Sequence, residues 1–331
     1  MNAPKGSSSD KNSQTIIDSA KRALKIESQA VEDLVNRIDE TFVNVVHHID
    51  QCQHLVITGM GKSGIIGKKI ASTFSSLGLP TLFVHAADAS HGDLGMIMKK
   101  DTVIAISNSG ETEEIAKLLP SFKRINCTLV AITGRPTSTL AKCSDYVLNI
   151  GVQEEACSKD LVPTSSTTAT LALGDALAVA LMELRGVQEE DFAQNHPGGS
   201  LGRRLLTTVA DLMHSGDEIP KVLEEAPSSE VIGEISKKHL GVTLVVDQEG
   251  NLKGLVTDGD LRRIVEKGKD ISKMNASIMM VKNPKTVTKE TLAAKAVQIM
   301  EEHSITSLIV TNEKKIDGII HLHAILKAGV V

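Results

Sequence analysis

The chain has 331 residues, of which 41% are hydrophobic, and this composition is typical of a globular protein with two or three domains. A net charge of -5, only 2% aromatic residues and no tryptophan argue against a nucleic-acid partner. The N-terminus lacks a signal-peptide core, and the most apolar stretch, 171–184, contains acidic residues, so we expect a cytoplasmic protein with no membrane partner. Spacing favours reduced thiols over disulfides or a zinc site for Cys52, Cys127, Cys143 and Cys157.

The first predicted element follows a polar tail over residues 1–14. Apolar residues recur at helical spacing from Val31 to Ile49, which predicts one long amphipathic helix. Short β-rich runs then alternate with helical stretches. The predicted strands are Leu55–Thr58, Thr81–His85, Thr102–Ser107, Thr128–Thr133 and Asp145–Ile150. Strands separated by helices predict an α/β fold with a doubly wound, parallel, five-stranded sheet.

Two further helices are predicted to close this domain, over about Thr167–Leu184 and Glu189–Gln194. The glycines and proline within 196–204 indicate a loop of defined shape. The last third of the chain then repeats itself: a shift of about 64 residues places His239 on His303 and Gly254 on Gly318. Each copy is predicted to contain a helix, two adjacent strands and a closing helix. Such short copies cannot easily bury a core alone, so we expect them to pack as a pair.

A glycine-rich turn, Gly-Met-Gly-Lys-Ser-Gly at 59–64, follows the first predicted strand. A P-loop is excluded because Val56 stands where that motif needs glycine. The G-x-G-x-x-G spacing also fits a dinucleotide-binding turn, with Asp88 downstream for the ribose, but one match of this kind is weak. A plain alternative is that the glycines only allow a sharp turn from strand to helix.

Three predicted loops rich in small hydroxyl residues share one feature, a position at the end of a strand or start of a helix. They are 61–64, 107–112 and 163–168. In a parallel sheet such loops emerge at one edge, where helix N-termini favour anions. Each cluster alone is more often a helix cap. Three together favour a compact sugar phosphate over a dinucleotide, whose phosphates would contact mainly the first loop.

The motifs at 58–64, 106–112 and 163–168 resemble the sugar isomerase (SIS) domain, which is flavodoxin-like, and the repeat resembles a pair of CBS domains. Together with the segments 85–95 and 195–202, they make nearly the whole chain similar to the D-arabinose 5-phosphate isomerase family. The resemblance implies an SIS domain over 15–206, a first CBS domain over 207–272 and a second over 273–331.

The family resemblance implies interconversion of D-ribulose 5-phosphate and D-arabinose 5-phosphate through an enediol, on the route to Kdo and lipopolysaccharide. It places Lys62, Glu114, Glu155 and His196 in the catalytic site. We expect Glu155 to be the proton-transfer base, Lys62 to stabilise negative charge and His196 to open the sugar ring. Glu114 could instead share the base role or hold Lys62. Without the resemblance, Lys62 is as easily a surface charge and Glu114 a favourable partner of a helix dipole.

The remaining expected substrate contacts are side chains in the same loops. They are Ser63, His85, His91, Ser107, Ser109, Thr112, Ser165, Ser166 and Thr167. On sequence alone, His85 and His91 are polar pocket residues, since their spacing is no recognised zinc pattern. The resemblance implies that both contact sugar phosphate and that His85 can bind an inhibitory zinc ion. Enediol chemistry requires no cofactor.

The CBS resemblance suggests a nucleotide site at Thr257 and Asp260, whereas the second copy has His321 and Ala324 at those positions. A structural role for the pair is therefore an equal alternative. The family implies a homotetramer in which His196 reaches a neighbouring subunit's site. Two other functions stay open: an SIS isomerase for a different sugar phosphate, and a non-enzymatic sugar-phosphate sensor. Such sensors usually have an N-terminal DNA-binding domain, for which the residues before the first strand give no support.

Overall fold

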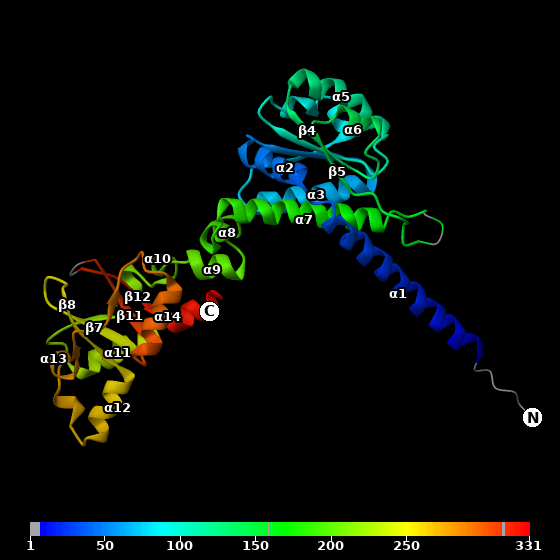
Figure 1. Ribbon diagram of the computed structural model, residues 1–331. Coiled ribbons are helices and arrows are strands. Elements are labelled where there is room, and N and C mark those ends of the chain that lie inside the picture. Colours follow the sequence, from blue (N-terminus) through cyan, green and yellow to red (C-terminus); the bar gives the residue numbers. More distant parts are fainter. Residues whose placement is uncertain (1–6, 158, 160, 313–314) are drawn as a thin grey trace, which may run out of the picture. The chain divides into compact units, whose positions relative to one another are not determined.

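The computed structural model describes residues 7–157, 159, 161–312 and 315–331. The chain forms two compact units, Met1–Asp191 and Phe192–Val331. The first unit contains the predicted sheet and the second contains the predicted repeats (Figure 1).

Two helices, and not one, precede the first strand. Helix α1 spans Ser7–Val35 and α2 spans Glu40–Gln51, so the prediction of one continuous helix over 31–49 is wrong. The side chain of Asp39 accepts hydrogen bonds from the backbone N–H groups of Thr41 and Phe42 and thereby starts the second helix. The predicted apolar face is nevertheless correct for α2, whose buried residues are Phe42, Val45, Val46 and Ile49.

The first unit contains five parallel strands in the order β2-β1-β3-β4-β5. Their bounds are β1 Leu55–Gly59, β2 Thr81–His85, β3 Thr102–Ile106, β4 Thr128–Thr133 and β5 Tyr146–Asn149. The connections contain α3 Gly61–Ser76, α4 Ala86–Ala89, η1 Asp93–Met96, α5 Glu113–Ile125 and α6 Thr139–Cys143. This strand order confirms the doubly wound, flavodoxin-like prediction.

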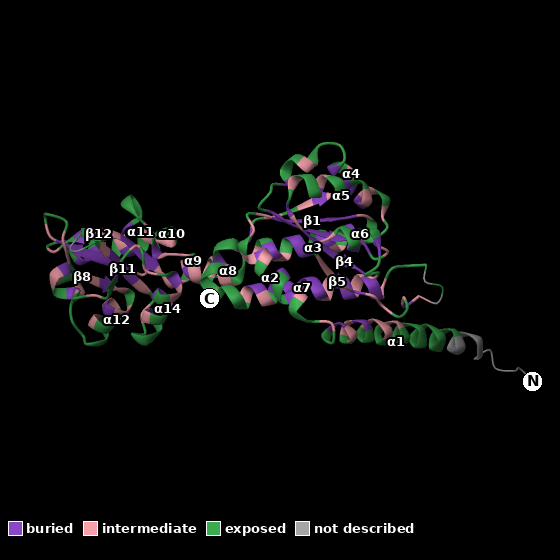
Figure 2. Ribbon diagram, turned by 45° about the horizontal axis from the view of Figure 1, so that its top comes forward, coloured by how far each residue is buried: buried purple, intermediate pink, exposed green. Residues whose placement is uncertain are grey.

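Each face of the sheet has its own apolar core, because successive strand residues point to opposite faces. Leu55 and Ile57 pack with α2, α3 and the later helix α7 (Ser165–Arg185), whereas Val56 packs with α4, α5 and α6. Figure 1 shows these two helical layers, and Figure 2 shows the buried strands between them. Burial on both faces explains why the central strands read as continuous apolar runs.

Helix α7 is long and apolar enough to cross a membrane by length and composition alone. Its contacts give it a different role, since it packs against α1, α2 and α3. Leu173, Leu177 and Leu181 lie in the core of the first unit, and Asp175 forms an ion pair with Lys69 of α3. We therefore describe α7 as a core helix of this unit.

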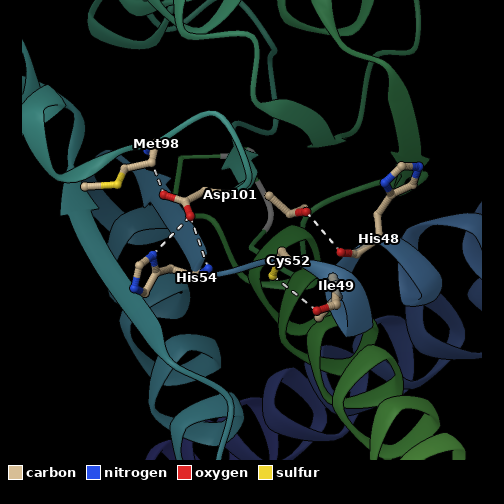
Figure 3. A network of polar contacts seen from close by, with 7 residues as sticks. His48, Ile49, Cys52, His54, Met98 and Asp101 are labelled. Carbon is tan, nitrogen blue, oxygen red and sulfur yellow. Dashed lines mark hydrogen bonds and ion pairs between the residues drawn. The ribbon is translucent and has the colours of Figure 1, made fainter.

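A buried carboxylate fixes the amino-terminal edge of the sheet (Figure 3). Asp101, just before β3, accepts hydrogen bonds from the backbone N–H of His54 at 3.1 Å and from the His54 ring at 3.0 Å. Its second oxygen accepts the N–H of Met98 at 2.7 Å. Nearby, the hydroxyl of Thr102 donates to the carbonyl of His48 in α2. These bonds align the starts of β1 and β3. All of them lie at the amino-terminal edge of the sheet, and none lies at the carboxyl-terminal edge.

The second unit begins within α8 (Glu189–Asn195), which is followed by α9 (Ser200–Leu206). The predicted shaped loop is thus confined to residues 196–199, and the expectation that it continues to Arg204 is wrong. Helix α9 can start here because Gly202 has no side chain: a Cβ at this position would lie 2.1 Å from the carbonyl oxygen of His196.

The two repeats form the remainder of the second unit. The elements around the first copy are α10 Val209–Leu212, η2 Gly216–Glu218, β6 Lys221–Leu223, α11 Ser228–Lys238, β7 Val242–Val246, β8 Leu252–Thr257, α12 Asp258–Glu266 and η3 Ile271–Lys273. Those around the second are α13 Ala276–Met279, β9 Val281–Lys282, β10 Thr286–Val287, α14 Ala293–Glu302, β11 Ser307–Asn312, β12 Lys315–His321 and α15 Leu322–Lys327. The predicted helix, strand pair and closing helix are present in both copies, although part of the second turn, 313–314, lies outside the described residues.

The opening segment of each copy packs on the other copy. His214 exchanges two backbone hydrogen bonds with Ile319 of β12, and Val209 joins the apolar core of the second copy. Conversely, Val281 of β9 pairs with Leu255 of β8, and Met279 joins the core of the first copy. The structure therefore supports the expectation that the copies pack as a pair, and it adds that their openings are exchanged.

Candidate active site

The loops expected to bind sugar phosphate emerge at the carboxyl edge of the sheet. β1 and β3 are neighbours at the centre of the strand order, and their connections leave toward opposite sides. In doubly wound sheets, the crevice at such a switch point is where ligands bind. The loop at 60–64 and the loop at 107–112 flank this point.

The turn from β1 to α3 is tight, as the glycine pattern predicts. A Cβ on Gly64 would lie 2.9 Å from the carbonyl oxygen of Gly59, and Gly61 has a positive φ of 52°. This turn places Lys62 exposed and Ser63 half-buried in the first turn of α3. Backbone N–H groups at this 16-residue helix start have no intrahelical partner and favour an anion.

The loop from β3 to α5 is organised by its own hydroxyl groups. Ser107 is buried, and its Oγ lies 2.8 Å from the Oγ1 of Thr112 and accepts the N–H of Gly110 at 3.0 Å. Ser109 accepts the N–H of Glu111 at 3.2 Å. The structure therefore brings the expected residues Ser107, Ser109 and Thr112 together in one turn at the start of α5.

Two glutamates follow this turn and have different surroundings. Glu111 accepts the backbone N–H of Thr139 at 2.8 Å, and hydrogen bonds from Thr139 lower the pKa of its carboxyl. Glu111 thus ties two adjacent loops together. Glu114 is half-buried in the first turn of α5, where the helix dipole favours its negative charge. The expected role of Glu114, to share the base function or hold Lys62, stays a prediction.

Glu155 lies in the connection between β5 and α7 and caps the start of α7. Its Oε2 accepts the N–H of Thr164 at 2.7 Å, the hydroxyl of Thr164 at 3.1 Å and the N–H of Ser166 at 3.3 Å. Its Oε1 accepts the hydroxyl of Ser166. Burial acts to raise the pKa of Glu155, but the donors from Ser166 and Thr164 together hold that pKa below its ordinary value.

The hydroxyl cluster at 163–168 mostly serves the protein itself. Ser166 donates to Glu155, and Thr167 donates to the carbonyl of Thr164 at 2.8 Å. Ser165 is fully buried, and its hydroxyl has no hydrogen-bond partner within the described part of the chain. The N-cap residue Thr164 makes no side-chain capping hydrogen bond, so the helix-cap alternative is wrong in detail: Glu155, and not a loop hydroxyl, accepts the helix N–H groups. Substrate binding by Ser165, Ser166 and Thr167 stays a prediction.

The two histidines after β2 lie in one connection. His85, the last residue of β2, has its Nδ1 3.7 Å from a carboxylate oxygen of Asp88, and His91 is exposed. Over the described ranges, no cluster of three or more histidine, cysteine, aspartate or glutamate side chains could hold a metal. Zinc binding by His85 therefore stays a prediction.

His196 belongs to the second unit, so its relation to the loops above stays a prediction. Its own setting is well defined. The ring stacks on Phe192, with centroids 4.0 Å apart, and Nδ1 lies 3.0 Å from the carbonyl oxygen of Phe192. If Nδ1 carries the proton that this carbonyl accepts, Nε2 is left as the free basic nitrogen.

Sequence reasoning missed two residues of this edge, Thr58 and Thr164. Thr58, at the end of β1, is buried, and its hydroxyl has no partner among the residues that the structure describes. Thr164 contacts Glu155 through both its backbone and its side chain. A threonine directly before a helix is a capping signal, which could have indicated Thr164. Nothing in the sequence marks the hydroxyl of Thr58.

In the second unit, a cavity of about 910 Å³ lies between the repeats and contains the expected nucleotide residues. Thr257 and Asp260 form a capping box at the start of α12, in which Asp260 accepts both the N–H and the hydroxyl of Thr257. Arg263 also donates to Asp260. His239, His303 and His321 line the same cavity. Burial is the largest cause that lowers the pKa of His321, and the nearby His323 and His214 lower it further.

Comparison with family models agrees with both units. The SIS domain model matches residues 48–180, and the CBS domain model matches residues 209–267 and 275–330. Arabinose 5-phosphate isomerase KdsD of Pseudomonas aeruginosa is 48% identical over 95% of this chain and 97% of its own length. Its counterpart from Escherichia coli K12 is 46% identical over 94% of this chain and 95% of its own length.

The chain belongs to the arabinose 5-phosphate isomerase family. Solved structures related to this family match the first unit. An E. coli CFT073 protein, c3406, solved in complex with arabinose 5-phosphate, is 43% identical with a TM-score of 0.54, covering 56% of this chain and 98% of its own. A putative sugar-phosphate isomerase from Listeria monocytogenes is 34% identical, with the same TM-score and coverage. The arabinose 5-phosphate isomerase family thus accounts for the SIS fold and the CBS pair together.

Proposed function

We propose that this protein interconverts D-ribulose 5-phosphate and D-arabinose 5-phosphate in the cytoplasm, as a step toward Kdo and lipopolysaccharide. The observation that supports this most is 46–48% identity to arabinose 5-phosphate isomerases over nearly the whole chain. The loops at 60–64 and 107–112 agree with it, because they offer helix N-termini and hydroxyl groups where the sheet's switch point lies.

The reaction moves one proton between adjacent carbons. A base removes a proton from C1 of the ketose while an acid protonates the oxygen on C2, which gives the enediol. The hydroxyl on C1 then loses its proton and C2 gains one, which gives the aldose. No electron leaves the substrate, so no redox cofactor is consumed. We propose Glu155 as the base, with Glu114 as its rival, Lys62 as the group that stabilises enediolate charge, and His196 as the ring-opening acid and base.

The test follows proton exchange in deuterated water by NMR, with ribulose 5-phosphate and a panel of aldose phosphates, after dialysis against a chelator. We expect deuterium at C2 of arabinose 5-phosphate, and we expect Glu155→Gln to lose at least about 100-fold in rate, the usual contribution of a general base. Exchange only with a hexulose or heptose phosphate would support the other SIS isomerase. Exchange with no sugar would support the sensor, and activity rescued only by added metal would contradict a cofactor-free reaction.

Zinc inhibition is tested with the same assay. Added zinc should slow the parent protein and have a weaker effect on His85→Ala, since an imidazole nitrogen is the proposed ligand. Equal inhibition of both proteins would show that the inhibitory zinc ion does not bind at His85.

A second candidate function concerns the cavity between the repeats, which we propose as a nucleotide site. Arg263 and Lys285, which line the cavity, offer positive charge for phosphate, and Thr257 also lines it, with its hydroxyl donating to Asp260. Calorimetry with AMP, ATP and CMP-linked Kdo tests this proposal. Binding that Thr257→Val weakens would support it, and no binding by any of the three would favour a structural role for the repeats.

A further inference from the structure

We propose that Thr164 and Ser166 are positioning residues, whose hydroxyl groups hold the carboxylate of Glu155 in one orientation and in its ionised form. The inference rests on the proposed function only for its catalytic consequence. Neither residue was expected to act on Glu155 from the sequence, and Ser166 was expected to contact substrate.

The hydroxyl of Thr164 is itself fixed on both sides. Its oxygen accepts the backbone N–H of Ala156 at 2.8 Å, so its single hydrogen is free to point at Oε2 of Glu155, 3.1 Å away. The carbonyl of Thr164 accepts the hydroxyl of Thr167 at 2.8 Å and the N–H of Thr168 at 2.9 Å. Thr164 thus connects the residue after Glu155 to the first turn of α7.

Ser166 holds the other carboxylate oxygen. It is 2% exposed, its hydroxyl donates to Oε1, and its N–H donates to Oε2. Both oxygens of Glu155 are therefore occupied by donors from Ser166 of α7 or from Thr164, the residue before it, and rotation of the carboxylate would break at least one hydrogen bond. Hydrogen bonds to an ionised carboxylate favour the ionised form, which is the form that a base needs.

Other charged and titratable groups surround this segment. Glu154, Cys157 and Lys159 belong to the same connection. From α1, which packs on α7, Glu27 accepts the hydroxyl of Thr168 at 3.0 Å. The four donors to Glu155 described above are uncharged, so the contribution of each hydroxyl can be removed without changing the charge of the site.

The direct test is a pH titration of the Glu155 carboxyl by ¹³C NMR in full-length protein with carboxyl-labelled glutamate, the signal being assigned by its loss in Glu155→Gln. We expect Thr164→Val and Ser166→Ala each to raise the pKa of Glu155 by about one, a roughly tenfold weaker acid, because each removes one donor to the charged form. Thr164→Ser keeps the hydroxyl and should keep the parent pKa.

Thr170→Val is the matched control. It removes a buried hydroxyl one turn further along α7, where Thr170 donates to the carbonyl of Ser166 and not to Glu155. If the pKa of Glu155 is unmoved in both Thr164→Val and Ser166→Ala, or moves equally in Thr170→Val, the inference is wrong. Should one variant not fold, the other decides by the same criterion.

Catalysis gives a second, separate measurement. With isomerase activity present, the acid limb of the kcat profile should move to higher pH in Thr164→Val and return in Thr164→Ser, because a base with a raised pKa is protonated at higher pH. A moved NMR titration with no isomerisation by the parent protein would sink the proposed function and leave the positioning role standing. An unmoved titration in an active enzyme would refute the positioning role and leave the proposed function standing.

Discussion

Single glycines set the close approaches between backbone segments of the first unit. Gly59 and Gly64 close the turn that presents Lys62, and Gly174 lets α7 approach α3. A Cβ on Gly174 would lie 2.4 Å from Cδ1 of the fully buried Ile70. In a helix interior, glycine otherwise costs about 1 kcal/mol relative to alanine, so close packing is the reason to have it here.

Gly174→Ala should therefore destabilise the parent protein, because an overpacked core costs about 1–3 kcal/mol and outweighs the gain in helix propensity. In an Ile70→Ala background the clash is absent, and the same change should stabilise by up to about 1 kcal/mol. Urea unfolding followed by the fluorescence of Tyr146, the single tyrosine, reports on the first unit. The same sign in both backgrounds would contradict this account.

The turns that carry the candidate site residues could be predicted from the sequence, and the contacts that could not have a physical cause. The glycines at 59–64 and the hydroxyls at 107–112 fix their own turns through short-range contacts, which the local sequence encodes. The bond between Glu155 and Thr164 spans nine residues and depends on how the intervening connection folds back. Thr58 shows the same limit, since its burial depends on strands distant in the sequence.

At the scale of elements, the two edges of the sheet have different roles. The carboxyl edge is occupied by the candidate site, whereas Asp101 braces the amino edge by accepting from His54 and Met98. The strand order and both apolar faces could be predicted because alternation of strands and helices leaves few topologies. The break before α2 could not, since apolar spacing continues through it, whereas the non-helical residues 36–39 and the capping contact of Asp39 separate α1 from α2.

Asp101→Ala should cost about 1–3 kcal/mol in the stability of the first unit, because it leaves the part-buried N–H donors of His54 and Met98 without their acceptor. His54→Ala removes only the ring contact, which is partly exposed, and should cost about 1 kcal/mol or less. Tyr146 fluorescence during urea unfolding measures both. A loss for Asp101→Ala no larger than that for His54→Ala would refute the bracing role.

At the scale of the whole molecule, the family resemblance predicts a homotetramer in which His196 of one subunit reaches the site of another, so that one site would draw residues from two subunits. Lys62→Ala and His196→Ala should each lose most isomerase activity when pure. After unfolding and refolding together, mixed oligomers would contain some sites with both Lys62 and His196 intact, and activity should partly return. No recovery, with mixed oligomers confirmed by mass spectrometry, would place His196 in the site of its own subunit.

The exchanged openings of the repeats also bear on how this protein can change over evolutionary time. Val209 and His214 lie at the start of the first copy yet complete the second, whereas Met279 and Val281 lie at the start of the second copy and complete the first. A deletion that removed one copy at its sequence boundary would strip the survivor of its own first strand partner and part of its core. An excision shifted along the chain, which removed residues 215–280, would instead leave Val209 and His214 joined to the second copy that they complete, so the stability of a single remaining repeat depends on where the cut falls.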